Sequence, residues 1–511
     1  MSADPTAAPT TPLSRTAEND IKAALAARRF FWTVEFIPSV DKVLRDELQK
    51  LGGVADAMQH TALYAGFAVT DRVVSDRDPD PVSAAAHLFD ASGKQPLVHL
   101  SGKGRDIADY PALLTRVRDL GLANLLILTG DRLKEEPADG RARYLESVPA
   151  IRAARQFDSQ LLIAVALNPF KYREEDGMAQ YLKLGKKVSA GANLAITQIG
   201  WDICKYGEAL GWVRERGYDI SLMANVMPLT AARARYMRRN QLAGVTITDS
   251  LLALLEQEEK MLADRGLARA LRRLALQVIG VRHMGYAGVQ ITGIHAIEKL
   301  DALAREIDSL ASLADDAPMW ERAWQEALAL PEGGRAETAP RNGWYLDDPI
   351  GRKASVNAPR YHAMHLTHRV LFDKGPVAAL LGALCAPIKP RHGLPDRLLA
   401  GIERALKAPL FGCENCGMCR LAATQYVCPE TCPKGLANGP CGGTSENLCE
   451  FRDRECIHSV KYRIARDAGV LDELETLLVP AVPSLLRGSA SWPPHFRGET
   501  PLAAKGDAGE G

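Results

Sequence analysis

The sequence predicts an α/β protein: a (β/α)8 TIM barrel followed by a smaller cysteine-rich metal-binding domain. Two observations predict the barrel. Eight short apolar segments alternate with amphipathic helical segments, and together they occupy about 280 residues, the usual size of that fold. A third observation predicts the second domain, because eight of the ten cysteines lie between Cys413 and Cys456.

The eight apolar segments have the composition of parallel strands that are buried on both faces, as in LLIAVAL at 161–167. The connection before the last one is longer and holds a charged helical stretch. A doubly wound sheet is the alternative fold, but no GxGxxG turn opens the first helix. The expected strands are 31–38, 65–71, 96–102, 124–131, 161–167, 194–202, 220–228 and 288–295.

Composition excludes several classes of protein. Lysine and arginine together number 63 and aspartate and glutamate 62, so the formal charge is +1. A nucleic-acid or membrane-surface binder needs surplus positive charge, so neither kind of partner is expected. No apolar run approaches the roughly 18 to 20 residues that span a bilayer, and the N-terminus lacks the pattern of a secretory signal. The sequence therefore predicts a cytoplasmic protein.

Polar residues recur where the expected strands end. In a barrel these ends meet at one face, where the active site is built. Each residue alone has a simpler explanation, as a helix N-cap or a hydrogen-bonded core residue. Together they predict a polar pocket for a small molecule. These residues are Glu35, Thr70, Asp71, His99, Asp131, Asn168, Gln198, Asp202, Asn225 and His295.

Four segments carry a resemblance to a known family. VEFIPS at 34–39, VHLSGKGRD at 98–106, LTGD at 128–131 and KKVSAGANLAITQ at 186–198 are similar to methylenetetrahydrofolate reductase. The resemblance covers residues 25 to about 310. It implies a flavin-dependent barrel enzyme that interconverts 5,10-methylene- and 5-methyltetrahydrofolate.

The resemblance also implies roles for the reacting groups. Ring opening requires protonation of a weakly basic nitrogen, and Glu35 stands at the family's acid position with apolar neighbours that would raise its pKa. Asp131 matches the aspartate beside flavin and pterin. Gln198 matches the glutamine that binds the pterin ring by paired hydrogen bonds. His295 occupies the region where many members have a substrate-binding arginine.

The cofactor expected from the resemblance is FAD, with FMN as the alternative. Departures from the family at Thr129 and at 167–172 affect the positions that meet the adenosine half of FAD. NAD(P)H or a ferredoxin-like carrier is the expected electron donor. The residues that match flavin contacts are Thr70, His99, Gly130, Asp131 and Lys187.

The clustered cysteines have the spacing of a metal site. Cys413, Cys416 and Cys419 follow C-x2-C-x2-C, which suits three ligands of a [4Fe–4S] cluster. Zinc bound by Cys-x2-Cys and Cys-x3-Cys pairs is the alternative, and eight thiols are enough for two sites. The remaining candidate metal ligands are Cys428, Cys432, Cys441, Cys449 and Cys456.

The cysteine-rich segment resembles the methylenetetrahydrofolate reductase C-terminal domain over residues 345–490, most specifically in CPETCPKGLANGPCGG at 428–443. Such a domain would relay electrons if it holds a cluster, or brace the barrel if it holds zinc. The domain boundaries expected from the sequence are a disordered lead at 1–24, the barrel at 25–312, a linker at 313–344, the cysteine-rich domain at 345–492 and a disordered tail at 493–511.

The sequence thus predicts a flavoprotein oxidoreductase that acts on tetrahydrofolate one-carbon units. A homo-oligomer is compatible with this prediction. The alternative is a non-catalytic scaffold or electron-transfer subunit of a tetrahydrofolate-dependent methyltransferase system. Glu35, Asp131 and Gln198 together favour the enzyme, because a scaffold needs none of the three.

Overall fold

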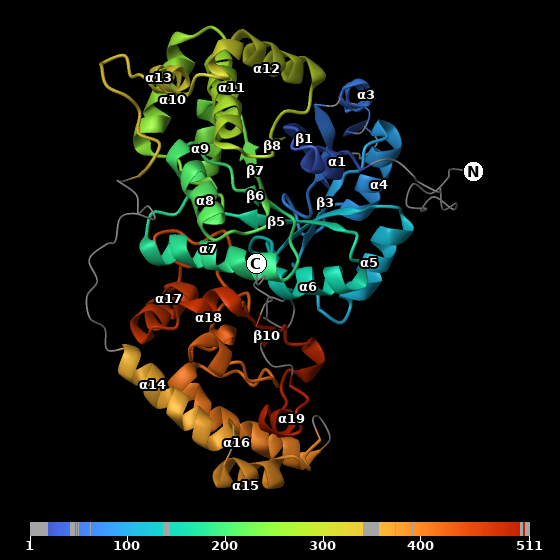
Figure 1. Ribbon diagram of the computed structural model, residues 1–511, viewed down its shortest axis with the longest axis vertical. Helices are drawn as coiled ribbons and strands as arrows, with labels where there is room; N and C mark the ends of the chain where they lie inside the picture. The colour runs from blue at the N-terminus through green and yellow to red at the C-terminus, as the bar shows by residue number, and fades with distance from the viewer. Residues whose placement is uncertain are drawn as a thin grey trace.

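The computed structural model describes residues 19–40, 46–47, 49, 51–61, 63–135, 144–340, 357–373, 375–389, 393–500 and 504–505. Eight parallel strands form a closed barrel in the order β1 to β8, and β8 pairs with β1. Helices surround the barrel, and a second domain lies beneath it (Figure 1). The predicted (β/α)8 fold is confirmed.

All eight predicted strands are present, and all but β5 end earlier than predicted. The residues beyond the strand ends leave the hydrogen-bonded ladder and form the loops at the mouth of the barrel. The strands are β1 (Phe31–Phe36), β2 (Tyr64–Val69), β3 (Leu97–Ser101), β4 (Asn124–Leu128), β5 (Leu162–Leu167), β6 (Leu194–Thr197), β7 (Ser221–Val226) and β8 (Gly288–Ile291).

The barrel helices carry local signals for their ends. Helix α4 starts after Asp80, whose side chain accepts a hydrogen bond from the Ser83 N–H, and stops at Gly93 in the left-handed region. The long connection before β8, in which a charged helical stretch is expected, forms three helices. The helices are α1 (Asp20–Ala26), α3 (Gly52–His60), α4 (Pro81–Ser92), α5 (Tyr110–Asp119), α6 (Ser147–Phe157), α7 (Glu174–Ser189), α8 (Ile203–Glu215), α9 (Ala231–Arg239), α10 (Asp249–Met261), α11 (Leu267–Met284), α12 (Ile297–Ser309) and α13 (Ala317–Glu326).

Three helices lie in or across the segments that the sequence assigns to the disordered lead, the linker and the disordered tail. Helix α1 buries Ile21 within the expected lead, most of which lies outside the described residues. Helix α13 lies in the expected linker and packs on α11, where the Trp320 indole N–H donates to the Leu276 carbonyl at 2.7 Å. Helix α19 (Trp492–Phe496) lies in the expected tail. Apolar side chains anchor these segments, because Ile21, Trp320 and Trp324 are all buried.

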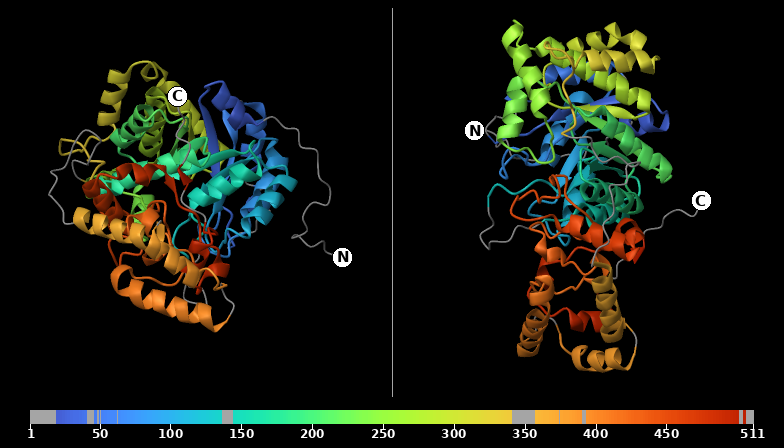
Figure 2. Two further views of the ribbon diagram at one scale, coloured as in Figure 1. Left: turned by 60° about the horizontal axis from the view of Figure 1, so that its bottom comes forward. Right: turned by 90° about the vertical axis from the view of Figure 1, so that its left-hand side faces the viewer.

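The second domain is built from helices joined by long loops that carry the cysteines. It packs on α7 of the barrel through α17 and α18 (Figures 1 and 2). Within the described part of the chain, no helix has the length and apolar character needed to cross a membrane. The elements are α14 (Asn357–His368), α15 (Pro376–Cys385), α16 (Leu394–Phe411), α17 (Ile457–Ala468), α18 (Leu471–Thr476), α19 and the short pair β9 (Leu477–Leu478) and β10 (Ala504–Lys505).

Candidate active site

The predicted site residues point into the barrel at its carboxyl end. Side chains on a strand alternate between two faces, so residues at even spacing share a face. Phe31 belongs to the apolar cluster inside the barrel, and Glu35 therefore points the same way. The same even spacing from Leu97 of this cluster applies to His99 on β3, whereas Thr70, Gly130 and Gln198 lie one or two residues beyond the ends of their strands.

Glu35 is the most strongly perturbed carboxyl group on the β1 side of the mouth. It is 8% exposed, and its removal from water raises its pKa to about 7, against the opposing effect of a hydrogen bond with Thr292. The Thr292 hydroxyl donates to Asn225 Oδ1 at 2.7 Å. A hydroxyl has one hydrogen, so Thr292 shares it between Asn225 and Glu35, and Asn225 weakens the hydrogen bond that lowers the Glu35 pKa. That arrangement favours a protonated Glu35. Sequence reasoning missed Thr292 and did not link Asn225 to the acid.

Two predicted flavin contacts leave buried polar atoms without partners. Thr70 Oγ1 and His99 Nε2 have no hydrogen-bond partner among the described residues, although both side chains are buried. Burial lowers the pKa of His99 to about 4, so its imidazole is neutral. The nearby strand residue Ala166 is exposed, which places solvent-accessible space at the mouth above β5. Orphaned polar atoms beside open space fit a bound polar group.

Lys187 lies on α7 and turns its ammonium group toward the barrel. Its Nζ donates to the Ala166 carbonyl at 2.5 Å. Burial, and to a smaller extent Lys183, lowers its pKa to about 7. The predicted flavin-contact lysine is therefore at the edge of the open space above β5.

Gly130 and Asp131 form the turn after β4. Gly130 has a φ of 86°, and a Cβ there would lie 2.9 Å from the Lys103 side chain, so the turn requires glycine. The Asp131 side chain is exposed, yet the protein around it raises its pKa by desolvation and through the charge of Glu450. Lys434 and Lys103 act in the opposite direction.

The turn is held from the second domain by an ion pair that sequence reasoning missed. Lys434 Nζ donates to the Gly130 carbonyl at 2.8 Å and to Glu450 at 2.5 Å. Glu450 Oε1 accepts the backbone N–H of Arg132 at 2.7 Å. Both charged side chains are almost fully buried. We call this pair the Lys434–Glu450 clamp. The sequence indicates the clamp only in that Lys434 and Glu450 each lie close to a predicted cysteine ligand.

Further contacts join the second domain to the end of β5 and to α7. Asn168 Nδ2 donates to the Gly442 carbonyl at 2.8 Å, and Lys171 Nζ to the carbonyls of Gly442 and Thr444. Lys183 Nζ donates to the Gly439 carbonyl at 3.0 Å. Residues 439–444 therefore cover the end of β5, where residues 167–172 depart from the family.

The two predicted substrate-binding residues are Gln198 and His295. The Gln198 amide donates to the Ala243 carbonyl at 3.1 Å and accepts from the Ile199 N–H at 2.9 Å. His295 is exposed in the loop after β8, four residues beyond the strand. The two Gln198 contacts use one N–H and one lone pair of its amide and leave one of each for a pterin ring.

The cysteines separate into two sets of four. Cys413, Cys416, Cys419 and Cys428 line one small cavity in the second domain. The other four influence one another electrostatically, as Cys432 and Cys441 each raise the pKa of Cys456 after the larger effect of burial. The second set is Cys432, Cys441, Cys449 and Cys456.

The predicted [4Fe–4S] site is not supported by this arrangement. Among the described residues, no three cysteine, histidine or acidic side chains converge closely enough to hold a metal ion. The Cys416 thiol instead contacts the Met418 carbonyl at 3.2 Å, and the Cys441 thiol contacts Glu450 at 3.3 Å. Burial raises the pKa of both thiols, which favours their protonated form.

Comparisons with known proteins agree with the two parts of the chain. A family described as methylenetetrahydrofolate reductase matches residues 20–295, and one described as methylene-tetrahydrofolate reductase C terminal matches residues 394–482. Methylenetetrahydrofolate reductase 1 of Schizosaccharomyces pombe is 27% identical over 169 residues, which cover 32% of this chain and 28% of the relative. Methylenetetrahydrofolate reductase 2 of Saccharomyces cerevisiae is 24% identical over 302 residues, 54% of this chain and 49% of the relative.

The chain therefore spans about half or less of the curated relatives it matches. Among solved structures, it is similar to an uncharacterized protein from Clostridium thermocellum that binds two copies of 5-methyl-5,6,7,8-tetrahydrofolic acid. That similarity has a TM-score of 0.43 at 11% identity and covers 56% of this chain and 97% of the other.

Proposed function

Because the chain belongs to the methylenetetrahydrofolate reductase family, we propose that it is a flavin-dependent oxidoreductase that interconverts 5,10-methylene- and 5-methyltetrahydrofolate. The observation that carries the proposal is Glu35, a buried carboxyl group at the mouth with a pKa of about 7. An acid with that pKa can donate and accept a proton near neutral pH.

The residues around the open space above β5 fit a flavin. Thr70 and His99 offer unpaired polar atoms, and Lys187 offers an amino group that donates hydrogen bonds at the rim. A bound flavin supplies the hydride donor and acceptor of the reaction. FAD is the proposed form. FMN is the alternative, since residues 439–444 cover the neighbouring part of the mouth.

The chain's own residues move the proton. Protonated Glu35 would donate to the folate ring nitrogen and open the five-membered ring, while burial holds the acid in its neutral form and Asn225 limits the opposing hydrogen bond from Thr292. Asp131 would place negative charge beside the cationic intermediate. Gln198 would bind the pterin ring through the amide N–H and lone pair that Ala243 and Ile199 do not use.

We propose that the second domain braces the barrel. Its clamp fixes the backbone on both sides of Asp131, through the Gly130 carbonyl and the Arg132 N–H. Electron relay through a cluster has less support, because the thiols do not converge on a metal. The ten free cysteines agree with a reducing cytoplasm, which is the proposed location.

The non-catalytic scaffold is the second candidate, and the partly occupied amide of Gln198 favours it. The two candidates differ in whether folate reacts. The full chain should be purified without oxygen, and its flavin should be identified by extraction from one portion. In the intact protein, the absorbance at about 450 nm should be followed on addition of 5-methyltetrahydrofolate. The enzyme is expected to lose this absorbance, whereas flavin-free protein, or flavin that stays oxidised, supports the scaffold.

The same preparation allows the electron donor and the metal content to be measured. NADH, NADPH and reduced ferredoxin should be compared as donors with methylenetetrahydrofolate as acceptor. Iron and zinc should be measured in the purified chain. More than one iron per chain, together with a preference for ferredoxin, would favour relay over bracing.

A further inference from the structure

The outward face of α16 exposes a row of large apolar side chains. Leu394, Leu398, Ile402 and Leu406 recur every four residues and are 70%, 60%, 55% and 58% exposed. We call these four residues the α16 row. Isolated exposed leucines are common on soluble proteins, but a continuous row of four is a typical feature of an interaction surface.

The inward face of the same helix is acidic. Glu403 is buried and accepts hydrogen bonds from the Ser491 N–H and the Trp492 N–H, each at 2.9 Å. Asp396 is also buried and accepts from the Ala490 N–H at 3.1 Å. The helix therefore turns these two acids toward its own domain and the four residues of the α16 row away from it. This is the reverse of an ordinary surface helix, whose apolar face is buried.

The spacing of the row suits a second helix of the same kind. Side chains four residues apart form a ridge, and two such ridges interdigitate when helices cross at about −50°. Gly401 and Ala405 lie beside the row, and a Cβ on Gly401 would meet nothing within 4 Å, so another backbone can approach there. A ridge of this kind is complementary to its own copy turned about a two-fold axis.

We propose that α16 is the contact surface of a homodimer, with Ile402 close to the two-fold axis. The occupant of the row is the α16 row of a second copy of this chain. The surface lies at the end of the second domain away from the barrel, so the mouth stays open in both subunits (Figures 1 and 2).

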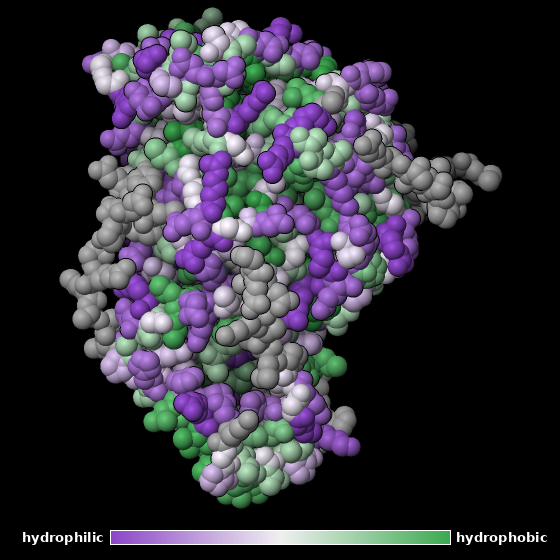
Figure 3. Space-filling view, in the orientation of Figure 1, coloured by the Kyte–Doolittle hydropathy of each residue, from purple (hydrophilic) through white to green (hydrophobic). Residues whose placement is uncertain are grey.

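The apolar area is of the size that such an interface needs. The four side chains present roughly 400 Å² of exposed surface, whereas an interface of about 800 Å² per partner is roughly 60% apolar. Leu380 and Leu384 on α15 are also exposed near this end of the molecule and can supply the remainder. Hydrophobic side chains gather at this end in the space-filling view (Figure 3).

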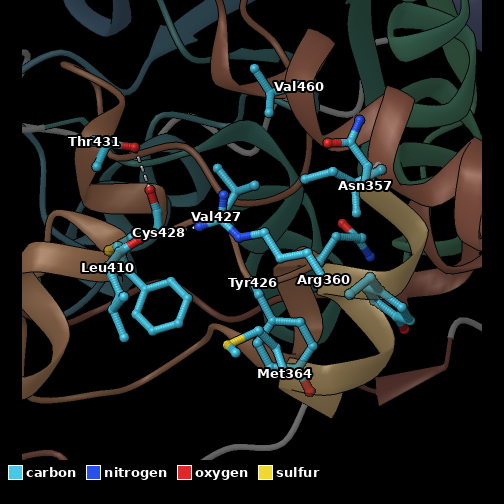
Figure 4. Close-up of a pocket in the computed structure, with 13 residues that line it drawn as sticks. Asn357, Arg360, Met364, Leu410, Tyr426, Val427, Cys428, Thr431 and Val460 are labelled. Carbon is cyan, nitrogen blue, oxygen red and sulfur yellow. Dashed lines mark hydrogen bonds between the residues drawn. The ribbon is translucent and has the colours of Figure 1, made fainter. Parts of the chain in front are cut away.

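Leu410 continues the spacing and is also 60% exposed. It lines a pocket with Arg360, Met364 and Tyr426, between the end of α16 and α14 (Figure 4). The surface available to a partner is therefore the stretch from Leu394 to Leu410, and its centre lies at Ile402.

The first test measures the mass of the full chain in solution by sedimentation or light scattering at micromolar concentration. The wild type is expected to be a dimer. The double variant Leu398→Asp/Ile402→Asp is expected to be a monomer with an unchanged circular dichroism spectrum, because both side chains are exposed. Met261→Asp, at a 72% exposed position on α10, is the matched control and should remain a dimer.

Cross-linking then tests the position of the axis. Ile402→Cys is expected to form a disulfide-linked dimer under mild oxidation, beyond any background of the wild type. Leu394→Cys lies eight positions away, about 12 Å along the helix, and is expected not to link to itself. A monomeric wild type, or a dimer that survives both aspartates, would overturn the proposal. In either case the α16 row would contact another segment of this chain or another protein instead of its own copy.

Discussion

The two sides of the barrel mouth are held in place by different parts of the molecule. On the β1 side, Glu35 is held by Thr292 and Asn225, which follow or belong to barrel strands. On the β4 side, the turn that carries Asp131 is held by Lys434 and Glu450 from the second domain. The proton donor is thus supported by the barrel alone, whereas its electrostatic partner depends on an interdomain contact.

This difference separates two kinds of variant. Changes on the β1 side should alter proton transfer and leave the domains together. Changes at the Lys434–Glu450 clamp should alter the stability of the interface and, through it, the Asp131 turn. The following predictions take the two sides in order of expected effect.

The largest effect is expected for Glu35→Gln, which keeps the shape of the acid but removes its proton. General acid–base catalysis contributes typically about 10²- to 10⁴-fold, so turnover should fall by that factor in both directions. The extracted flavin content should be unchanged. Steady-state rates with both folate substrates provide the measurement, with Glu326→Gln, an exposed change on α13, as the control. Intact turnover in Glu35→Gln would remove the basis of the proposed function.

Removal of one member of the clamp should have the next largest effect. Lys434→Met leaves Glu450 buried and unpaired, and such a loss costs about 3–5 kcal/mol. It also removes a charge that lowers the pKa of Asp131, so that pKa should rise further. Thermal unfolding of the full chain measures the first effect.

The double variant Lys434→Met/Glu450→Gln removes both charges and should recover part of the lost stability. Arg77→Met breaks an exposed pair with Glu135 and should cost less than about 1 kcal/mol. Equal losses in Lys434→Met and Arg77→Met would show that the clamp does not hold the turn.

The β1 side was more accessible to sequence reasoning than the β4 side. The barrel follows from the alternation of apolar strands and helices, and Glu35, Thr70 and His99 could be placed because they lie on or beside those strands. Thr292 lies just beyond β8. It meets Glu35 because β8 pairs with β1, and these two strands become neighbours only when the barrel closes.

The β4 side could not be completed from the sequence. Gly130 and Lys434 are 304 positions apart, and no local pattern indicates that a lysine between cysteines meets a turn of the barrel. The cysteine spacing favoured metal ligation, yet Cys441 instead contacts Glu450 of the clamp. Spacing identifies residues that could meet at a metal, whereas the folded backbone decides whether they do.

A glycine at the interface offers a smaller change on the β4 side. Gly439 has a φ of 153°, and a Cβ there would lie 2.8 Å from Lys183. Gly439→Ala should therefore destabilise the contact with α7 by about 1–3 kcal/mol. Gly442→Ala is the matched control, because its Cβ would meet only Asn168 at 3.9 Å. A comparison of their unfolding temperatures tests the contact, and equal temperatures would contradict it.

The smallest effects are expected on the β1 side, as opposite shifts in pH dependence. Reduction of methylenetetrahydrofolate requires protonated Glu35, so its rate should fall as the pH rises through about 7. Asn225→Ala frees the Thr292 hydroxyl to donate to Glu35, which favours the carboxylate and should move this limb to lower pH. Thr292→Val removes the hydrogen bond that lowers the Glu35 pKa, and the limb should move to higher pH.

Each shift should be about one pH unit or less, since one unit corresponds to about 1.4 kcal/mol and a typical hydrogen bond contributes about that much. Shifts of the same sign in the two variants would show that Asn225 does not act on Glu35 through Thr292.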